Sequence, residues 1–191
     1  MEQNMDNNIS EGKDKGKGSN FFKDWILPII IAIVLATMIN KFWFFFIKVP
    51  TGSMEPTIMP GDKILVTRIY NKEKLQRGDI VVFYSEELSK ENNKTTNLVK
   101  RLIGLPGDKV IIEENGDIYI NGKKTNEDYV KYQLGIEREF TVPQGKYLFL
   151  GDNRANSNDA RLWSQTYIDK SDIMGKAKVT VFPFSRFGKL K

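Results

Sequence analysis

The chain of 191 residues contains neither cysteine nor histidine. Without cysteine, disulfide scaffolds, thiol nucleophiles and thiolate metal sites are excluded. Without histidine, there is no Ser-His-Asp triad, no imidazole base and no typical zinc site. Any catalysis must therefore use serine, threonine, lysine, tyrosine, aspartate or glutamate, and we expect no metal ion and no other cofactor.

The chain also lacks a block of charge of one sign. Its 29 basic and 24 acidic side chains give a net charge of +5, but they are interspersed along most of the sequence. A nucleic-acid partner is therefore not expected. With 40% hydrophobic and 12% aromatic residues, the composition is that of a folding chain with one packed core.

Large apolar residues are scarce in the first twenty residues, and charge is absent from the sixteen residues Trp25–Asn40. Residues 1–20 cannot bury enough surface to offset the entropy of ordering, so we predict a disordered cytoplasmic tail. A helix over Trp25–Ile47 would be roughly 35 Å long, enough to cross a bilayer core of about 30 Å. Residues 21–47 are therefore predicted to be a transmembrane anchor helix, rather than a buried core helix or a cleaved signal sequence.

The distribution of lysines indicates the orientation of this anchor. Only Lys48 and Lys63 follow the apolar segment within twenty residues, whereas four lysines precede it: Lys13, Lys15, Lys17 and Lys23. The positive-inside rule then places the N-terminus in the cytoplasm. We predict a single-pass cell-membrane protein with residues 48–191 on the extracytoplasmic side.

Beyond the anchor, no amphipathic helix longer than about two turns is evident. Short β-branched runs alternate with glycine, proline, asparagine and aspartate, a pattern typical of an all-β domain. Asn115-Gly116 predicts a hairpin, and the polar segment Glu86–Thr96 predicts an exposed loop. The predicted strands are Lys63–Tyr70, Ile80–Ser85, Leu98–Gly104, Lys109–Glu114, Asp117–Ile120, Lys146–Leu150 and Ala177–Phe182.

A turn rich in glycine and proline, Val49–Thr57, follows the anchor and contains Ser53. A fully extended chain from Phe46 to Ser53 reaches about 25 Å at most, so this hydroxyl is expected near the bilayer surface. Taken alone, the turn also fits a plain linker in which Ser53 bonds to its own backbone.

A second segment, Asn97–Gly107, places a lysine in an apolar strand. Strand alternation puts Lys100 on the face of Leu98 and Leu102, where partial desolvation favours the neutral amine. Lowering its pKa by about 3 units costs roughly 4 kcal/mol and yields a usable base. The neighbouring Arg101 stays charged and cannot be that base. Taken alone, the strand also fits a solvated lysine on an exposed face.

A third segment, Gly151–Arg161, carries two arginines and two aspartates in eleven residues. A calcium loop does not match, because counting from Asp152 places Ser157 where glycine is needed and Trp163 where glutamate is needed. The segment fits either a surface turn or a buried ion-pair network that holds a neighbouring site in shape.

Together these segments resemble type I signal peptidase, the bacterial leader peptidase family of membrane-anchored endopeptidases with a Ser-Lys dyad. The resemblance covers Val49 to Phe182 in the same order, with an anchor before it as in the family. The matching motifs are Ser53-Met-x-Pro-Thr57, Arg77-Gly-Asp-Ile-Val-Val-Phe83, Lys100-Arg-Leu-Ile-Gly-Leu-Pro-Gly-Asp108, and Gly151-Asp-Asn-Arg154 with Ser157, Asp159 and Arg161.

The resemblance implies a role for each of these residues. Ser53 would be the nucleophile and Lys100 the general base, and Ser157 would orient the Lys100 amine. The oxyanion hole would use the Ser53 N–H and the side chain of Thr51. The remaining residues fall into two groups: structural support from Asp152, Arg154, Asp159 and Arg161, and substrate binding by Val49, Met54, Ile58, Leu98 and Val99.

The resemblance also implies a fold and a function. The fold is a mainly β, partly open barrel-like catalytic domain with a small hairpin subdomain, whose accessory region at about 112–140 is reduced. The function is removal of N-terminal signal peptides from exported preproteins after a small-x-small site, with membrane lipid and the export machinery as neighbours. Two alternatives stay open: a self-cleaving Ser-Lys protease of the repressor type, and an inactive anchored β module that binds exported chains.

Overall fold

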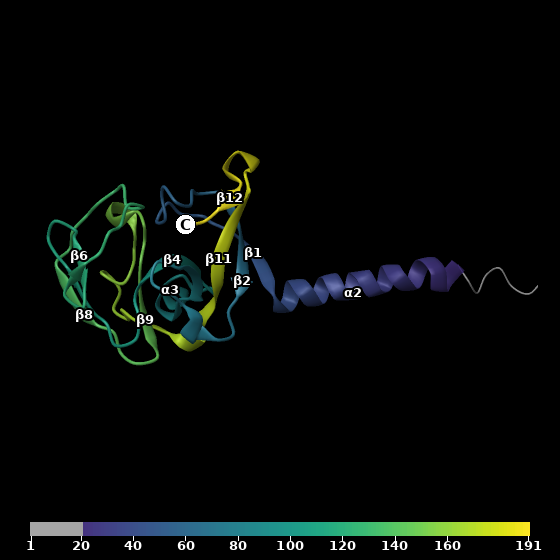
Figure 1. The fold of residues 1–191 in the computed structure, drawn as a ribbon, viewed down its shortest axis with the longest axis horizontal. Coiled ribbons are helices and arrows are strands. Elements are labelled where there is room, and N and C mark those ends of the chain that lie inside the picture. Colours follow the sequence, from purple (N-terminus) through teal and green to yellow (C-terminus); the bar gives the residue numbers. More distant parts are fainter. Residues whose placement is uncertain (1–20) are drawn as a thin grey trace, which may run out of the picture. The chain divides into compact units, whose positions relative to one another are not determined.

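The computed structural model describes residues 21–191, so the predicted tail lies outside the described residues. An apolar helix comes first, with a π-helical turn η1 (Phe22–Ile26) followed by α2 (Leu27–Phe42), drawn in purple in Figure 1. Over Phe22–Ile39 the mean hydropathy is 2.0, and none of this window is buried. The helix is long and apolar enough to cross a membrane.

The apolar segment does not remain helical to Ile47, and that part of the prediction is wrong. The helix ends at Phe42, and β1 (Phe44–Lys48) pairs antiparallel with β2 (Lys63–Arg68). Aromatic and β-branched residues favour a strand that has a partner, and here Phe45 lies opposite Val66. Phe45 and Ile47, on one face of β1, pack against the domain core.

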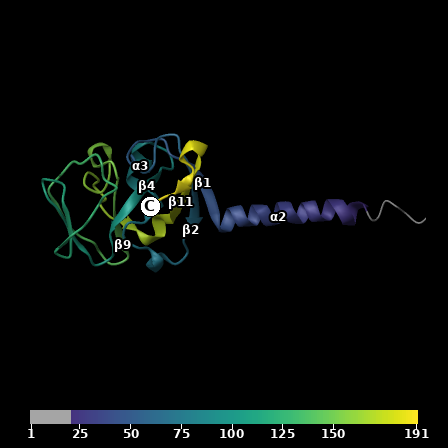
Figure 2. The ribbon, with the colours of Figure 1, turned by 45° about the horizontal axis from the view of Figure 1, so that its top comes forward.

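The rest of the chain is mainly β, as predicted. A main antiparallel sheet has the strand order β1-β2-β11-β3-β4-β9-β10, with β12 paired to β11, and a small sheet has the order β7-β6-β5-β8. Figures 1 and 2 show β6 and β8 of the small sheet at the far side of the domain from β1 and β2. The further strands are β3 (Ile80–Tyr84), β4 (Asn97–Gly104), β5 (Lys109–Ile112), β6 (Ile118–Ile120), β7 (Lys123–Lys124), β8 (Arg138–Thr141), β9 (Lys146–Leu150), β10 (Ile168–Asp169), β11 (Ile173–Phe182) and β12 (Gly188–Lys189).

Short helical turns join these strands. The predicted loop Glu86–Thr96 is partly wrong, because it begins with α3 (Glu86–Glu91). Ser85 caps this helix by accepting the Leu88 N–H at 3.3 Å, and two glutamates occupy its first turn, where the helix dipole favours negative charge. The remaining turns are η2 (Lys72–Lys74), η3 (Arg154–Asn156), η4 (Lys170–Asp172) and η5 (Phe184–Arg186).

Two Asn-Gly turns build the small sheet. The predicted hairpin at Asn115-Gly116 is confirmed: it joins β5 to β6, and Gly116 has a φ of 87°. A second pair, Asn121-Gly122, joins β6 to β7 with φ values of 51° and 78°, as a tight two-residue hairpin turn requires. That signal is equally plain in the sequence, but the analysis above did not use it.

The core consists of two hydrophobic clusters that lie on opposite faces of β3. The inter-sheet cluster includes Val81, Phe83 and residues of both sheets. The second, here called the Met54 cluster, includes Ile80 and Val82. Alternation along one strand thus supplies both clusters. The buried members of the Met54 cluster are Val49, Met54, Ile58, Ile64, Val66, Ile80, Val82 and Ala177.

Candidate active site

Ser53 lies in a loop, Val49–Asp62, that joins β1 to β2. The loop is closed at its base, where the Val49 N–H donates to Asp62 O at 2.8 Å and the Gly61 N–H donates to Val49 O at 2.7 Å. Met54 is fully buried in the Met54 cluster, whereas Ser53 is half-buried. Packing of the next residue therefore holds the backbone of Ser53 in place, while Ser53 itself is not fully buried.

Lys100 lies in β4 between β3 and β9 and is only 2% exposed. Its Nζ donates a hydrogen bond to Ser157 Oγ at 2.9 Å. Within residues 21–191 it forms no ion pair, and no hydrogen bond joins it to Ser53. Burial lowers the pKa of Lys100 from 10.5 to about 8; the charge of Asp159 opposes this shift and that of Arg161 adds to it. A buried amine with a hydroxyl partner is thus close to neutral at mildly alkaline pH.

Gly151 is the point at which the Ser53 and Lys100 segments meet. A Cβ atom placed on Gly151 would lie 2.3 Å from Ser157 Oγ and 2.4 Å from Ser53 O. Because both atoms lie this close to one point, they are less than about 5 Å from each other. The partner of Lys100 therefore adjoins the backbone of Ser53, although the two segments are far apart in sequence.

Asp159 and Arg161 form a buried ion pair at 2.8 Å. Burial by itself would raise the pKa of Asp159, but hydrogen bonds from Arg161 and from the Gly151 N–H hold it below its usual value. Arg161 also donates to the carbonyls of Arg154 and Leu134 at 2.8 Å and 2.9 Å. Of the two open interpretations of the loop Gly151–Arg161, the structure supports the buried network.

Arg101 and Asp152 form a second buried pair. Two nitrogens of Arg101 donate to the two oxygens of Asp152 at 2.8 Å and 2.6 Å, and Thr57 Oγ1 donates to the same carboxylate at 2.5 Å. The pair thus joins β4 and the Gly151–Arg161 loop to the Ser53 loop. Sequence reasoning excluded Arg101 as a base but found no role for it, or for Thr57.

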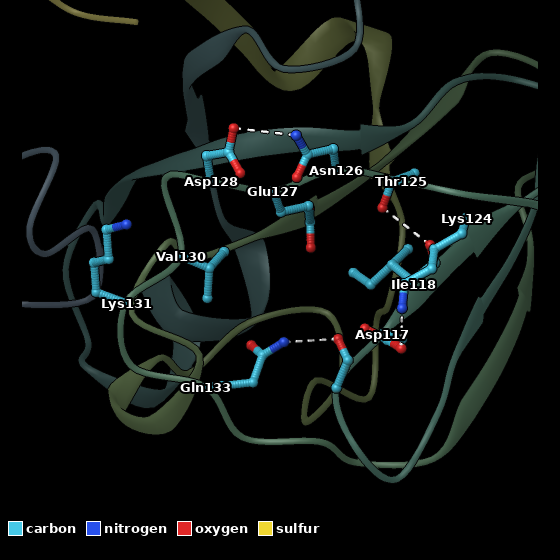
Figure 3. A pocket seen from close by; sticks show the side chains of 11 residues that line it. Asp117, Ile118, Lys124, Thr125, Asn126, Glu127, Asp128, Val130, Lys131 and Gln133 are labelled. Atoms are coloured by element: carbon cyan, nitrogen blue, oxygen red, sulfur yellow. Dashed lines mark hydrogen bonds and ion pairs between the residues drawn. The ribbon is translucent and has the colours of Figure 1, made fainter.

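Arg154 pairs with a residue that the sequence analysis did not identify. Its guanidinium donates to both oxygens of Glu127 at 2.8 Å, and these contacts raise the pKa of Arg154 despite the opposing effect of burial. Glu127 also lines a cavity of about 360 Å³ beside β6 (Figure 3), where Lys124 pairs with Asp117 and Gln133 donates to Gly116 O at 2.9 Å. Neither Ser53 nor Lys100 lines that cavity.

The five predicted substrate-binding residues divide between the two clusters. Val49, Met54 and Ile58 are buried members of the Met54 cluster, and Val99 packs against it, whereas Leu98 packs against the inter-sheet cluster. Thr51, the predicted oxyanion donor, is exposed at the surface of the Ser53 loop. Among the described residues, no group of three or more acidic side chains gathers in a way that could hold a metal ion.

Comparison with known proteins identifies relatives along almost the whole chain. Residues 22–182 match the family model described as signal peptidase, peptidase S26. The chain is 34% identical to a probable signal peptidase I-2 of Synechocystis, over 97% of this chain and 86% of that protein. It is 35% identical to signal peptidase IB of Staphylococcus aureus, over 86% of this chain and 91% of that protein. A solved signal peptidase I of Enterococcus faecalis is 31% identical, with a TM-score of 0.44, over 54% of this chain and 96% of that chain.

Proposed function

Because this chain belongs to the signal peptidase family, peptidase S26, we propose that it removes N-terminal signal peptides from preproteins. The chain is a serine endopeptidase of that family, and its lack of histidine requires a base other than imidazole. The observation that best supports a particular base is the burial of Lys100 beside a hydroxyl and without a carboxylate partner.

In this mechanism, neutral Lys100 accepts the hydroxyl proton of Ser53. Ser53 Oγ then attacks the carbonyl carbon of the scissile bond, and protonated Lys100 returns a proton to the leaving amine as the acyl-enzyme forms. Water, activated by the same amine, hydrolyses the ester and releases the enzyme. The pKa of about 8 suits both steps, because the amine is partly neutral near neutral pH yet still basic enough to accept a proton.

The surrounding residues hold the two reacting groups. Ser157 accepts the Lys100 hydrogen bond and aims the amine, and the ion pairs of Asp152, Arg154, Asp159 and Arg161 hold the loop that carries Ser157. The negative charge that develops on the substrate carbonyl oxygen would be met by the Ser53 N–H and the hydroxyl of Thr51.

A substrate in this site would bind as an extended strand. Small side chains at the first and third positions before the cut would enter shallow pockets, whose walls Val49, Met54, Ile58, Leu98 and Val99 would form or back. Leu98, on the same face of β4 as Lys100, would also keep water from the Lys100 amine, so selectivity and base activation share this side chain.

The apolar helix Phe22–Ile39 would anchor the enzyme in the cell membrane. The lysine distribution favours a cytoplasmic N-terminus and a catalytic domain on the extracytoplasmic side. Only one residue separates α2 from β1, so the domain that carries the Ser53 loop begins directly after the anchor. We expect it to act beside membrane lipid, on preproteins leaving the export machinery.

The test is cleavage of a precursor whose signal ends in Ala-x-Ala, in detergent, by the full chain and by Ser53→Ala and Lys100→Met. We expect cleavage at that site by the unaltered chain alone, and no loss of stability in either variant. The rate should rise from neutral pH through about pH 8 and then level off as Lys100 becomes neutral. A flat profile from pH 6 to 10, with chemistry rate-limiting, would contradict the lysine base.

The same assay separates the alternatives. Binding of the precursor without cleavage by the folded full chain would favour an inactive binding module. Cleavage of this chain itself, but not of the precursor, would favour a self-cleaving Ser-Lys protease. Unfolding of both variants would show that Ser53 and Lys100 are structural residues.

A further inference from the structure

Asn153 lies in the Gly151–Arg161 loop and contacts the Ser53 loop, and no role has been given to it above. It is 5% exposed and lies just before η3. Its side-chain Nδ2 donates to Gly52 O at 3.2 Å, and its backbone N–H donates to Ser53 O at 3.1 Å. Its Oδ1 accepts the Asn156 N–H at 3.1 Å. Nδ2 also donates to Glu55 Oε2 at 3.4 Å. Since an amide oxygen can only accept and an amide NH₂ can only donate, all three side-chain contacts agree on the orientation of the amide.

The bond to Gly52 O bears on the Ser53 N–H through the geometry of the peptide. A peptide unit is planar, and in the trans form its C=O and N–H point in opposite directions. The Gly52–Ser53 peptide is trans. Holding Gly52 O toward Asn153 therefore turns the Ser53 N–H away from it. Within residues 21–191 this N–H donates no hydrogen bond, so it is available to a ligand.

We propose that Asn153 is a positioning residue that sets the direction of the Ser53 N–H, the backbone donor of the oxyanion hole. The inference rests on the proposed function, since that donor matters only if Ser53 attacks a carbonyl. Asn153 would not touch the substrate. It acts through the Gly52–Ser53 peptide, and its bond to Ser53 O fixes the next peptide as well.

A second contact limits the size of the effect. Gly52 O also accepts the Glu55 N–H at 3.1 Å, so part of the orientation survives without Asn153. Complete removal of an oxyanion-hole donor costs about 10²–10³-fold in kcat. Misdirecting a donor that remains present should cost less, and we expect about a tenfold loss.

The variant Asn153→Asp removes the Nδ2 donor from both Gly52 O and Glu55 Oε2. It keeps an oxygen to accept the Asn156 N–H and keeps the backbone N–H that binds Ser53 O. It replaces the Nδ2 donor with an oxygen, so two acceptors would face each other at Gly52. The matched control is Asn158→Asp, which adds the same charge to an exposed position of the same loop.

Three measurements on the full chain in detergent complete the test. The first is kcat on the Ala-x-Ala precursor at about pH 10, where Lys100 is neutral even if the added charge raises its pKa. The second is KM for that precursor. The third is the affinity for a substrate-like peptide boronate: Ser53 Oγ bonds to boron, its proton passes to Lys100, and boron becomes a tetrahedral anion that mimics the oxyanion.

We expect Asn153→Asp to lower kcat and boronate affinity by a similar factor of about ten, with KM and the melting temperature unchanged and Asn158→Asp as active as the parent. Unchanged kcat in Asn153→Asp would overturn the inference, as would a loss that appears in KM but not in boronate affinity. Asn153→Ser, which removes Nδ2 without adding a charge beside Glu55, must show the same selective loss. Absence of cleavage by the parent chain would overturn the proposed function itself, and the inference with it.

Discussion

The two faces of β4 bury two neighbouring cations in opposite ways. Lys100, on the face of Leu98 and Leu102, has the neutral Ser157 hydroxyl as its hydrogen-bond partner. Arg101, on the other face, bonds to both oxygens of Asp152. Both side chains are 2% exposed, so the amount of burial does not distinguish them.

The difference lies in the counter-charge. Burial disfavours a charged group, and without a bonded carboxylate the lysine responds by giving up its proton more readily. The arginine cannot do so, and a buried arginine is tolerated because it is paired and fully hydrogen-bonded. One strand thus buries an amine with a lowered pKa on one face and a paired arginine on the other.

Lys100→Arg should produce the largest change, because it places a permanent charge on the face built for a neutral amine. Guanidinium does not release a proton in this pH range, so cleavage should fall by about 10⁴-fold or more. The measurement is single-turnover cleavage of the precursor. Lys109→Arg, at an exposed position of β5, is the matched control and should stay active. Substantial activity in Lys100→Arg would refute the Ser53–Lys100 dyad.

Arg101→Met removes the cation from the paired face and leaves Asp152 buried without a partner. Breaking a buried ion pair in this way costs about 3–5 kcal/mol of unfolding free energy. Denaturant unfolding in detergent measures it. The double variant Arg101→Met/Asp152→Asn, which leaves no uncompensated charge, should recover much of the loss. A double variant less stable than Arg101→Met would mean that the unpaired charge of Asp152 is not the cause of the lost stability.

Lys100→Met should have the opposite effect on stability. The pKa of Lys100 is about 8 in the folded protein, whereas the ordinary value for a solvated lysine is 10.5. At pH 7, burying this amine therefore costs the folded state up to about 3 kcal/mol of unfolding free energy. That cost is complete below pH 8 and disappears as the pH rises toward 10.5. The inactive variant should therefore be more stable than the parent at pH 7, with a gain that shrinks by pH 10. Equal destabilisation at both pH values would contradict this.

Glu127→Gln tests the outermost pair of the network and should have the smallest effect. The glutamine keeps one acceptor for Arg154 but removes the negative charge, so we expect a loss of about 2 kcal/mol in unfolding free energy. Thermal unfolding should show it directly. If cleavage falls while stability does not, Glu127 acts on the chemistry and not on the fold.

Local features of the fold could be predicted from short stretches of sequence. The uncharged run predicted the helix, and Asn115-Gly116 predicted its hairpin, because both depend on neighbouring residues. The end of the helix could not be placed in the same way. Phe44–Lys48 is apolar enough for a membrane helix, and only pairing with β2 makes it a strand.

In the candidate site, too, some features could be predicted from short stretches of sequence and others depend on tertiary contacts. Motifs located Ser53, Lys100 and Ser157, and the bond between Lys100 and Ser157 is present in the structure. The partners of the arginines were not predictable. Arg154 bonds to Glu127 and not to an aspartate of its own loop, and no sequence signal marks Glu127.

By itself, the sequence determined which chemistry is open to this protein. A chain without cysteine and histidine, with an apolar segment of membrane-spanning length and ordered serine and lysine motifs, has few other ways to cleave a peptide. Only the tertiary structure decided which of the two buried cations is paired with a carboxylate and which with a hydroxyl. Lys100 and Ser157 are 57 positions apart, and Arg101 and Asp152 are 51 apart. The pKa of a buried group depends on what lies within a few ångströms of it, and folding alone brings those atoms together.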